Sequence, residues 1–207
     1  TAWVHQIKTP LSVMRLQLQS EDTPENRAML AELFQMEQYV TMALSYARLG
    51  NPTKDLVLTR VPLDPVIRQA IRDFAPLLIR KKLRLQYEPT AESALTDSKW
   101  LLFILHQLLS NAVKYTERGR VSIRVTSAPA IIEADTGIGI APEDVPRVFE
   151  KGYTGYNGRG GQKSTGLGLY LVHQTAEMLH CRVSLSSRIG EGTSVTIDLH
   201  QEELGKE

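Results

Sequence analysis

LLSNAVKYT (residues 108–116), ADTGIGI (134–140) and STGLGLYLV (164–172) follow one another in the second half of this chain. The first is typical of a helix with an asparagine at its centre, the second of a strand that ends in a tight turn, and the third of a helix that begins at glycines. Glycine lets backbone come close to a ligand, and the free N–H groups at the start of a helix favour phosphate. In this order the three segments predict an ATP pocket.

The bulk composition is that of a soluble globular protein. The chain has 207 residues, of which 42% are apolar and 23% charged, enough for one large domain or two small ones. A formal net charge of +1 with mixed signs offers no basic stripe, so no nucleic-acid partner is expected. The single cysteine, Cys181, excludes an internal disulfide and a multi-cysteine metal site, and it fits a reducing compartment.

The start of the chain has the character of an interior segment. Thr1 stands in an apparent helix without an initiator methionine, and we expect a fragment whose upstream portion is missing. Neither a signal peptide nor a run of 18 apolar residues occurs, so no membrane span is expected within the sequence itself.

The first 50 residues are predicted to form a helical hairpin. Two amphipathic helices are joined by SEDTPE (20–25), where Asp22 or Thr23 would cap the second helix, and Gly50-Asn51-Pro52 would end it. A lone hairpin has little interior, so we expect it to pair with a second copy as a four-helix bundle. The apolar seam residues step by three and four: Val4, Ile7, Leu11, Met14 and Leu18, then Met29, Leu33, Met36, Val40, Ala43 and Ala47.

From Leu56 onward, short strand-like runs alternate with helices, which indicates a second domain. A mixed sheet with helices on one face, an α/β sandwich, follows from this order. The run YTGYNGRGGQKSTG (153–166) lacks apolar periodicity and is predicted to be a mobile lid over the glycine segments. Strands are expected near 56–61, 83–87, 120–126, 130–135, 182–187 and 193–199, and helices near 64–80, 97–116 and 166–179.

Several residues of the pocket suit an adenine base. Asp135 ends an apolar run, where its carboxylate would accept a hydrogen bond from the exocyclic amine of adenine and so select it over guanine. Gly137 and Gly139 would let the backbone approach. Tyr115 would lay its ring or hydroxyl against the base or the ribose.

Other residues suit the phosphates. Asn111 and Lys114 share a helical face, which places an amide oxygen able to ligate Mg²⁺ beside an ammonium able to meet phosphate. Gln107, four residues earlier, lies on the same face. The expected phosphate cradle is a helix start at Gly166 and Gly168, with further donors on Lys163, Ser164 and Thr165.

Each motif by itself has a plainer explanation. A GxG after a strand is usually only a turn, an asparagine within a helix usually lies on the surface, and a Gly-Leu-Gly is often a close-packed helix start. Their joint order favours a functional site. His5, five residues before Pro10 on the first helix, is then a candidate phosphate acceptor.

The motifs resemble, in order and spacing along nearly the whole chain, those of the sensor histidine kinases of bacterial two-component systems. The amino-acid sequences of three of these motifs, the H, F and G2 boxes, are similar to those of the intramembrane-sensing kinases that work beside ABC transporters and respond to antimicrobial peptides. The matching segments are WVHQIKTPL (3–11, H box), HQLLSNAVKYT (106–116, N box), DTGIGI (135–140, G1 box), RVFEKGYTG (147–155, F box), STGLGLYLV (164–172, G2 box) and GEGTSVTI (190–197, final strand).

By resemblance the chain is α+β, with a dimerisation and histidine phosphotransfer hairpin at 1–52 and a Bergerat-type ATP-binding domain at 53–207. The family's activity would be protein-histidine kinase: ATP with Mg²⁺ phosphorylates His5, and the phosphoryl group passes to an aspartate of a response regulator receiver domain. Gln6 would orient the imidazole, and Thr9 would position water for phosphatase activity toward the regulator. Leu167 and Thr193 join the ATP site through the G2 and final-strand motifs.

The resemblance also implies partners and a location. A homodimer would form through residues 1–50, and missing upstream membrane segments would hold the chain at the cytoplasmic face of the membrane, where an ABC transporter would be a partner.

Two departures from the family pattern keep alternatives open. Gln6 replaces the acidic residue that usually follows the histidine, and an amide cannot act as a base. Gln107 stands where related gyrase-type and chaperone-type ATPases have a water-activating carboxylate, which favours transfer to His5 over hydrolysis. A water-directed ATPase or clamp of the same fold, and an ATP-binding scaffold inactive as a kinase in this fragment, are the alternatives.

Overall fold

The computed structural model describes residues 2–49, 56–155 and 165–200, with side chains from Gln6 to Ala47 in the first range. The chain divides into two compact units, Thr1–Asn51 and Pro52–Glu207. The predicted α+β class is confirmed, with a helical unit followed by a mixed sheet and its helices. The middle of the proposed lid, 156–164, and the stop signal at 50–52 lie outside the described residues.

The first unit is a hairpin of α1 (Ala2–Gln19) and α2 (Pro24–Leu49). Of the two predicted caps, Thr23 is the one observed: the backbone N–H of Asn26 donates to its Oγ1 at 3.1 Å. Leu11 and Leu33 of the predicted seam are buried in the contact between the helices.

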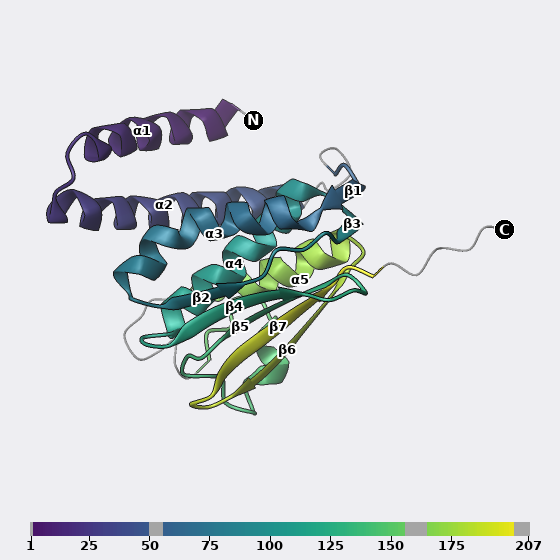
Figure 1. The fold of residues 1–207 in the computed structure, drawn as a ribbon. Helices are drawn as coiled ribbons and strands as arrows, with labels where there is room; N and C mark the ends of the chain where they lie inside the picture. Colours follow the sequence, from purple (N-terminus) through teal and green to yellow (C-terminus); the bar gives the residue numbers. More distant parts are fainter. Residues whose placement is uncertain (1, 50–55, 156–164, 201–207) are drawn as a thin grey trace. The chain divides into compact units, whose positions relative to one another are not determined.

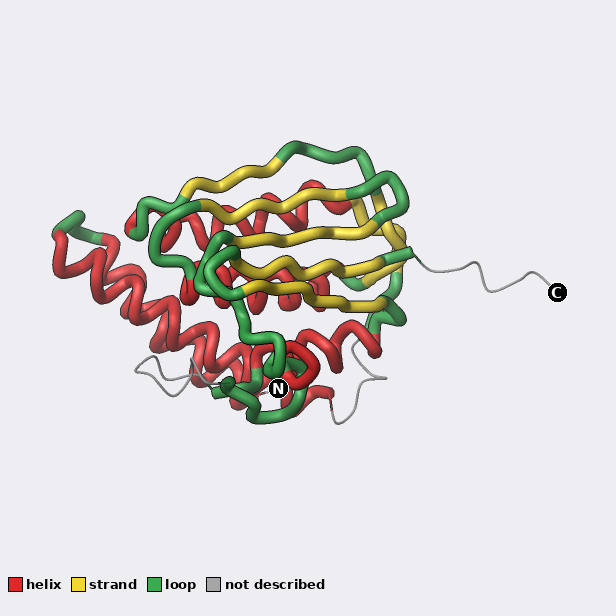
Figure 2. The backbone as a smooth tube through the Cα atoms, turned by 90° about the horizontal axis from the view of Figure 1, so that it is seen from below, coloured by secondary structure: helices red, strands yellow, loops and turns green. Residues whose placement is uncertain are grey.

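The second unit contains a five-stranded mixed sheet in the order β2-β4-β5-β7-β6, in which β2 runs parallel to β4 and the other neighbours are antiparallel. Three helices, α3, α4 and α5, cover one face of this sheet (Figure 1 and Figure 2). The strands are β2 (Arg84–Tyr87), β4 (Arg120–Val125), β5 (Ala130–Asp135), β6 (Arg182–Arg188) and β7 (Gly192–Asp198), and the helices are α3 (Leu63–Arg80), α4 (Ser98–Tyr115) and α5 (Gly168–Met178).

One small sheet departs from the expected order. β1 (Thr59–Pro62) pairs antiparallel with β3 (Ser93–Thr96) and is separate from the main sheet. β3 was not predicted, because its apolar Leu95 is 47% exposed while the polar Thr96 is buried, the reverse of the usual alternation. A short 3₁₀ helix, η2 (Val145–Arg147), was also not predicted.

Helix α4 forms the centre of the second unit and positions the site. It packs against α3, α5 and β5 and is therefore apolar on most of its surface, with Leu101, Ile104 and Leu108 buried. The carboxylate of Asp97 accepts from the N–H groups of Lys99 and Trp100 and caps its start. At the other end the Lys81 ammonium donates to the carbonyl oxygens of Val113 and Thr116, at 2.5 and 3.2 Å.

Candidate functional site

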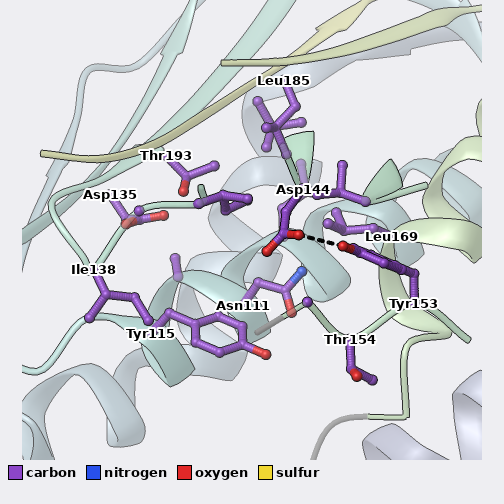
Figure 3. Close-up of a pocket in the computed structure, with 18 of the residues that line it drawn as sticks. Asn111, Tyr115, Asp135, Ile138, Asp144, Tyr153, Thr154, Leu169, Leu185 and Thr193 are labelled. Carbon is purple, nitrogen blue, oxygen red and sulfur yellow. Dashed lines mark hydrogen bonds between the residues drawn. The ribbon is translucent and has the colours of Figure 1, made fainter. Parts of the chain in front are cut away.

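A cavity that is open to solvent lies between α4, β5, β7 and the start of α5. Figure 3 shows side chains from these elements directed toward one another, with Asn111 and Tyr115 of α4 facing Asp135 and Thr193 of the sheet. The cavity is lined by Leu108, Asn111, Ala112, Tyr115, Glu133, Asp135, Ile138, Gly139, Ile140, Asp144, Val148, Tyr153, Thr154, Gly155, Gly166, Gly168, Leu169, Leu185, Thr193 and Val195.

Asp135, the last residue of β5, is held by the turn that follows it. Its Oδ1 accepts from the backbone N–H of Gly137 at 2.7 Å and from the Thr116 hydroxyl at 3.4 Å. Burial raises the pKa of Asp135, while the backbone hydrogen bonds from Gly137 and Thr193 act in the opposite direction. The result is a half-buried, oriented acceptor at the wall of the cavity.

The glycines of the DTGIGI turn are needed for close packing. A Cβ on Gly137 would lie 2.5 Å from the carbonyl oxygen of Tyr115, so this residue joins the turn to the end of α4 and is not among the residues that line the cavity. Gly139, which does line it, has φ +71°, and a Cβ there would lie 1.9 Å from the carbonyl oxygen of Arg188.

The four predicted residues of α4 do not all reach the cavity. Asn111 and Tyr115 line it, whereas Lys114 does not, and its ammonium lies 5.2 Å from the centre of the Tyr115 ring. Gln107 is 3% exposed and lies behind the lining, where its Oε1 would be 3.3 Å from a Cβ on Gly168. The absence of a side chain at Gly168 therefore lets α5 approach Gln107 closely.

The start of α5 corrects one prediction. Gly168 is the first helical residue and Leu167 its N-cap, whereas Gly166 has φ +64°, outside the helix. A Cβ on Gly166 would lie 2.3 Å from the carbonyl carbon of Gly152, so this glycine is required where the two segments touch. The Thr165 hydroxyl accepts from the N–H of Leu167 at 3.3 Å. Lys163 and Ser164 lie outside the described residues.

The residues proposed for phosphotransfer lie on α1, in the other unit. Gln6 and Thr9 are exposed there, and His5 belongs to the helix, with its side chain outside the described part.

Four lining residues that carry polar groups were not predicted: Glu133, Asp144, Tyr153 and Thr154. The Tyr153 hydroxyl donates to the Asp144 carboxylate across the cavity wall (Figure 3), and the Arg147 guanidinium lies 4.2 Å from the centre of the Tyr153 ring. Tyr153 and Thr154 belong to the F-box motif and to the predicted lid, which placed their segment near the pocket without singling them out, whereas no motif or periodicity pointed to Asp144. Glu133 could have been found, because it is two residues before Asp135 on the same strand and therefore shares its face.

Residues 96–203, about half of the chain, match the model of the histidine kinase-, DNA gyrase B- and HSP90-like ATPases. The chain belongs to this family. Its ATPase-type domain contains α4, the main sheet apart from β2, and the whole of the described cavity lining.

Curated relatives extend this similarity to the hairpin. The chain is 38% identical to the Sensor protein BceS of Halalkalibacterium halodurans, over 97% of this chain and 61% of that one. It is 36% identical to the Sensor histidine kinase YxdK of Bacillus subtilis, over 93% of this chain and 61% of that one. It is 33% identical to the Sensor protein kinase GraS of Staphylococcus aureus, over 95% of this chain and 58% of that one. The resemblance to sensor histidine kinases is confirmed, and the chain spans about three fifths of the length of these relatives.

Solved structures support the fold. The full-length ShkA structure in complex with AMPPNP superposes with a TM-score of 0.65 at 26% identity, over 95% of this chain and 44% of that one. The histidine kinase AdeS of Acinetobacter baumannii superposes with a TM-score of 0.63 at 21% identity, over 95% of this chain and 98% of that one. At this identity the similarity supports the fold alone.

Proposed function

We propose that this chain is the catalytic part of a protein-histidine kinase that binds ATP in the described cavity and phosphorylates itself on His5. The observation that carries the proposal is the convergence of separate motifs. Asn111 of the N box, Asp135 of the G1 box, Gly168 of the G2 box and Thr193 of the final strand line one cavity. The same chain carries an H-box helix, α1, and is similar to sensor histidine kinases over nearly its full length.

In this proposal the base binds against the sheet. The Asp135 carboxylate accepts a hydrogen bond from the exocyclic amine of adenine, whereas guanine would present a carbonyl oxygen to it. Tyr115, which faces the cavity in Figure 3, packs against the base or the ribose. The backbone at Gly166 and Gly168 receives the phosphates, with further donors from Thr165, Leu167 and the segment that contains Lys163 and Ser164.

Magnesium would enter with the phosphates. Within the described ranges no group of three or more His, Cys, Asp or Glu side chains is placed to hold a metal ion, so a cage made by the protein alone is not expected there. The Asn111 side chain, an oxygen-bearing amide on the cavity wall, suits a cation that keeps its water and phosphate ligands. A bound Mg²⁺ would neutralise phosphate charge during transfer.

The chemical step is in-line phosphoryl transfer. A nitrogen of the neutral His5 imidazole attacks the γ-phosphorus, the bond from that phosphorus to the β-γ bridging oxygen breaks, and ADP leaves while a phosphoramidate forms. The phosphoryl group then passes to an aspartate carboxylate of a receiver domain. In this scheme the Lys114 ammonium, which lies beside the Tyr115 ring and outside the cavity lining, adds positive charge near the phosphates, and Gln107, an amide, does not activate water.

Further assignments follow the same resemblance. Gln6 orients the imidazole and Thr9 positions water for dephosphorylation of the regulator. A dimer forms through residues 1–50, and upstream segments anchor the protein at the cytoplasmic face of a membrane beside an ABC transporter, where it responds to antimicrobial peptides. In the part of the chain that the structure describes, no helix is both long and apolar enough to cross a membrane.

The first test is incubation with γ-³²P-ATP and Mg²⁺, with His5→Gln and Asn111→Asp as variants. We expect label that is acid-labile and base-stable in the unaltered chain and lost in both variants. His180→Gln is the control, because this exposed histidine lies at the end of α5 and should leave labelling unchanged. ATP that binds without any labelling would instead favour the scaffold, and rapid release of phosphate without a labelled intermediate would favour the water-directed ATPase.

A further inference from the structure

Glu133 is a carboxyl side chain buried in the wall of the cavity. Only 2% of it is exposed, and its Oε1 has no hydrogen-bond partner. In the described part of the chain, four other buried side-chain atoms lack partners, on Gln38, Thr96, Gln107 and Thr175, and none of these residues lines the cavity. Since buried polar atoms are nearly always hydrogen-bonded, this oxygen at a ligand cavity points to a partner that the bound ligand supplies.

The strand register explains why Glu133 faces the cavity. It lies opposite Ile123 of β4 and Val195 of β7, both buried, on the face of the sheet that the helices cover. Asp135, two residues further along β5, shares that face because side chains alternate along a strand. The cavity therefore has two carboxyl groups side by side on one strand, with Thr193 of β7 opposite Asp135.

The two carboxyl groups differ in how strongly their surroundings favour the protonated form. Burial, and then the negative charge of Asp135, hold the pKa of Glu133 well above its usual range. Asp135 is less buried and receives hydrogen bonds from backbone N–H groups that favour its charged form. The pKa of Glu133 is thus shifted toward the protonated form, whose O–H is a donor, beside Asp135, whose carboxylate oxygens are acceptors.

This pair matches an edge of adenine. The exocyclic amine of adenine is a donor, and the ring nitrogens next to it, N1 and N7, are acceptors. We propose, building on the ATP site proposed above, that Glu133 is a second base-recognition residue, which donates a hydrogen bond to one of these ring nitrogens, directly or through one water, while Asp135 accepts from the amine. Hypoxanthine and guanine present a carbonyl oxygen at the amine position, which Asp135 would disfavour, and an N–H at N1, which Glu133 would also disfavour where N1 is the nitrogen that it contacts.

The test measures equilibrium binding of ATP, 1-deaza-ATP and 7-deaza-ATP by calorimetry, with the unaltered chain, Glu133→Gln and Glu133→Leu. The deaza analogues keep the amine and lose one ring acceptor each. We expect the unaltered chain to bind one of the two analogues about tenfold more weakly than ATP, as for a lost hydrogen bond. Glu133→Gln, which keeps a donor, should preserve that discrimination, and Glu133→Leu should bind ATP and that analogue equally.

Thr175→Val is the matched control. Thr175 is fully buried on α5, its hydroxyl also lacks a partner, and it does not line the cavity, so this variant should discriminate as the unaltered chain does. A Glu133→Leu variant that is folded and still discriminates against the analogue would overturn the proposal, as would equal binding of all three nucleotides to the unaltered chain. If the unaltered chain bound no ATP at all, the proposed ATP site itself would be wrong. That result is distinguishable from the two results that would overturn the role of Glu133.

Discussion

At the scale of single residues, two glycines with nearly the same backbone have different roles. Gly139 and Gly152 have φ values of +71° and +78°. A Cβ on Gly139 would meet the carbonyl oxygen of Arg188 at 1.9 Å, whereas a Cβ on Gly152 would meet nothing within 4 Å. Both positions favour glycine for conformational reasons, but only Gly139 is also needed for packing between the G1 turn and the end of β6.

Gly139→Ala should therefore destabilise the chain more than Gly152→Ala. Left-handed strain costs each variant about 1 to 2 kcal/mol, and only Gly139→Ala adds a backbone clash. The measurement is urea unfolding of both variants with ATP binding as a second readout, which Gly139→Ala should also weaken. Equal loss of stability in the two variants would mean that the turn moves away from β6 without cost.

At the scale of elements, the hairpin carries more apolar surface than its own interior uses. Met14, Met29 and Met36 of the predicted seam are between 48% and 52% exposed, and Val13 and Leu16 are exposed as well. Exposed apolar side chains along both helices are what a second hairpin would cover in the proposed bundle.

The expected result is a dimer in sedimentation equilibrium that Met36→Glu converts to monomer. A charge in an apolar seam is costly to bury, whereas the neighbouring Gln35 is exposed and outside the seam, so Gln35→Glu introduces the same charge as a control. A strict monomer of the unaltered chain at high concentration contradicts the bundle.

Elements also differ in how well the sequence predicts them. The bounds of α3, α4 and the strands of the main sheet were predicted to within one residue at each end, because the apolar periodicity of these elements follows from the core that they bury. β3 was missed since Leu95 points to solvent, and the start of α5 was placed two residues early since Gly166 has a left-handed backbone. Both errors occur where tertiary contacts override the local pattern.

At the scale of the whole second unit, Glu133 should couple stability to pH. In the unfolded chain this carboxyl loses its proton near its ordinary value of 4.5, whereas the folded chain retains it to higher pH. Between these two values the folded state binds more protons, so the contribution of Glu133 to stability falls as pH rises.

Glu133→Gln removes this dependence. The variant should gain stability relative to the unaltered chain between pH 5 and pH 8, by up to about 1.4 kcal/mol per pH unit in the window between the two pKa values. Urea unfolding at both pH values measures it, and the exposed Glu143→Gln serves as control. A constant difference between Glu133→Gln and the unaltered chain would show that Glu133 is ionised in the folded state.

The sequence by itself determined the hairpin, the order of the helices and the main-sheet strands, the family, and four of the cavity's polar side chains, those of Asn111, Tyr115, Asp135 and Thr193. These follow from local rules: apolar period, glycine turns, caps and motif spacing. Only the tertiary structure decided that Asn111 lines the cavity while Lys114 does not, that Gly137 packs on α4, and that Glu133 stands beside Asp135 without a partner. Such choices depend on which segments distant in sequence meet and in which register, and local sequence preferences do not fix that register.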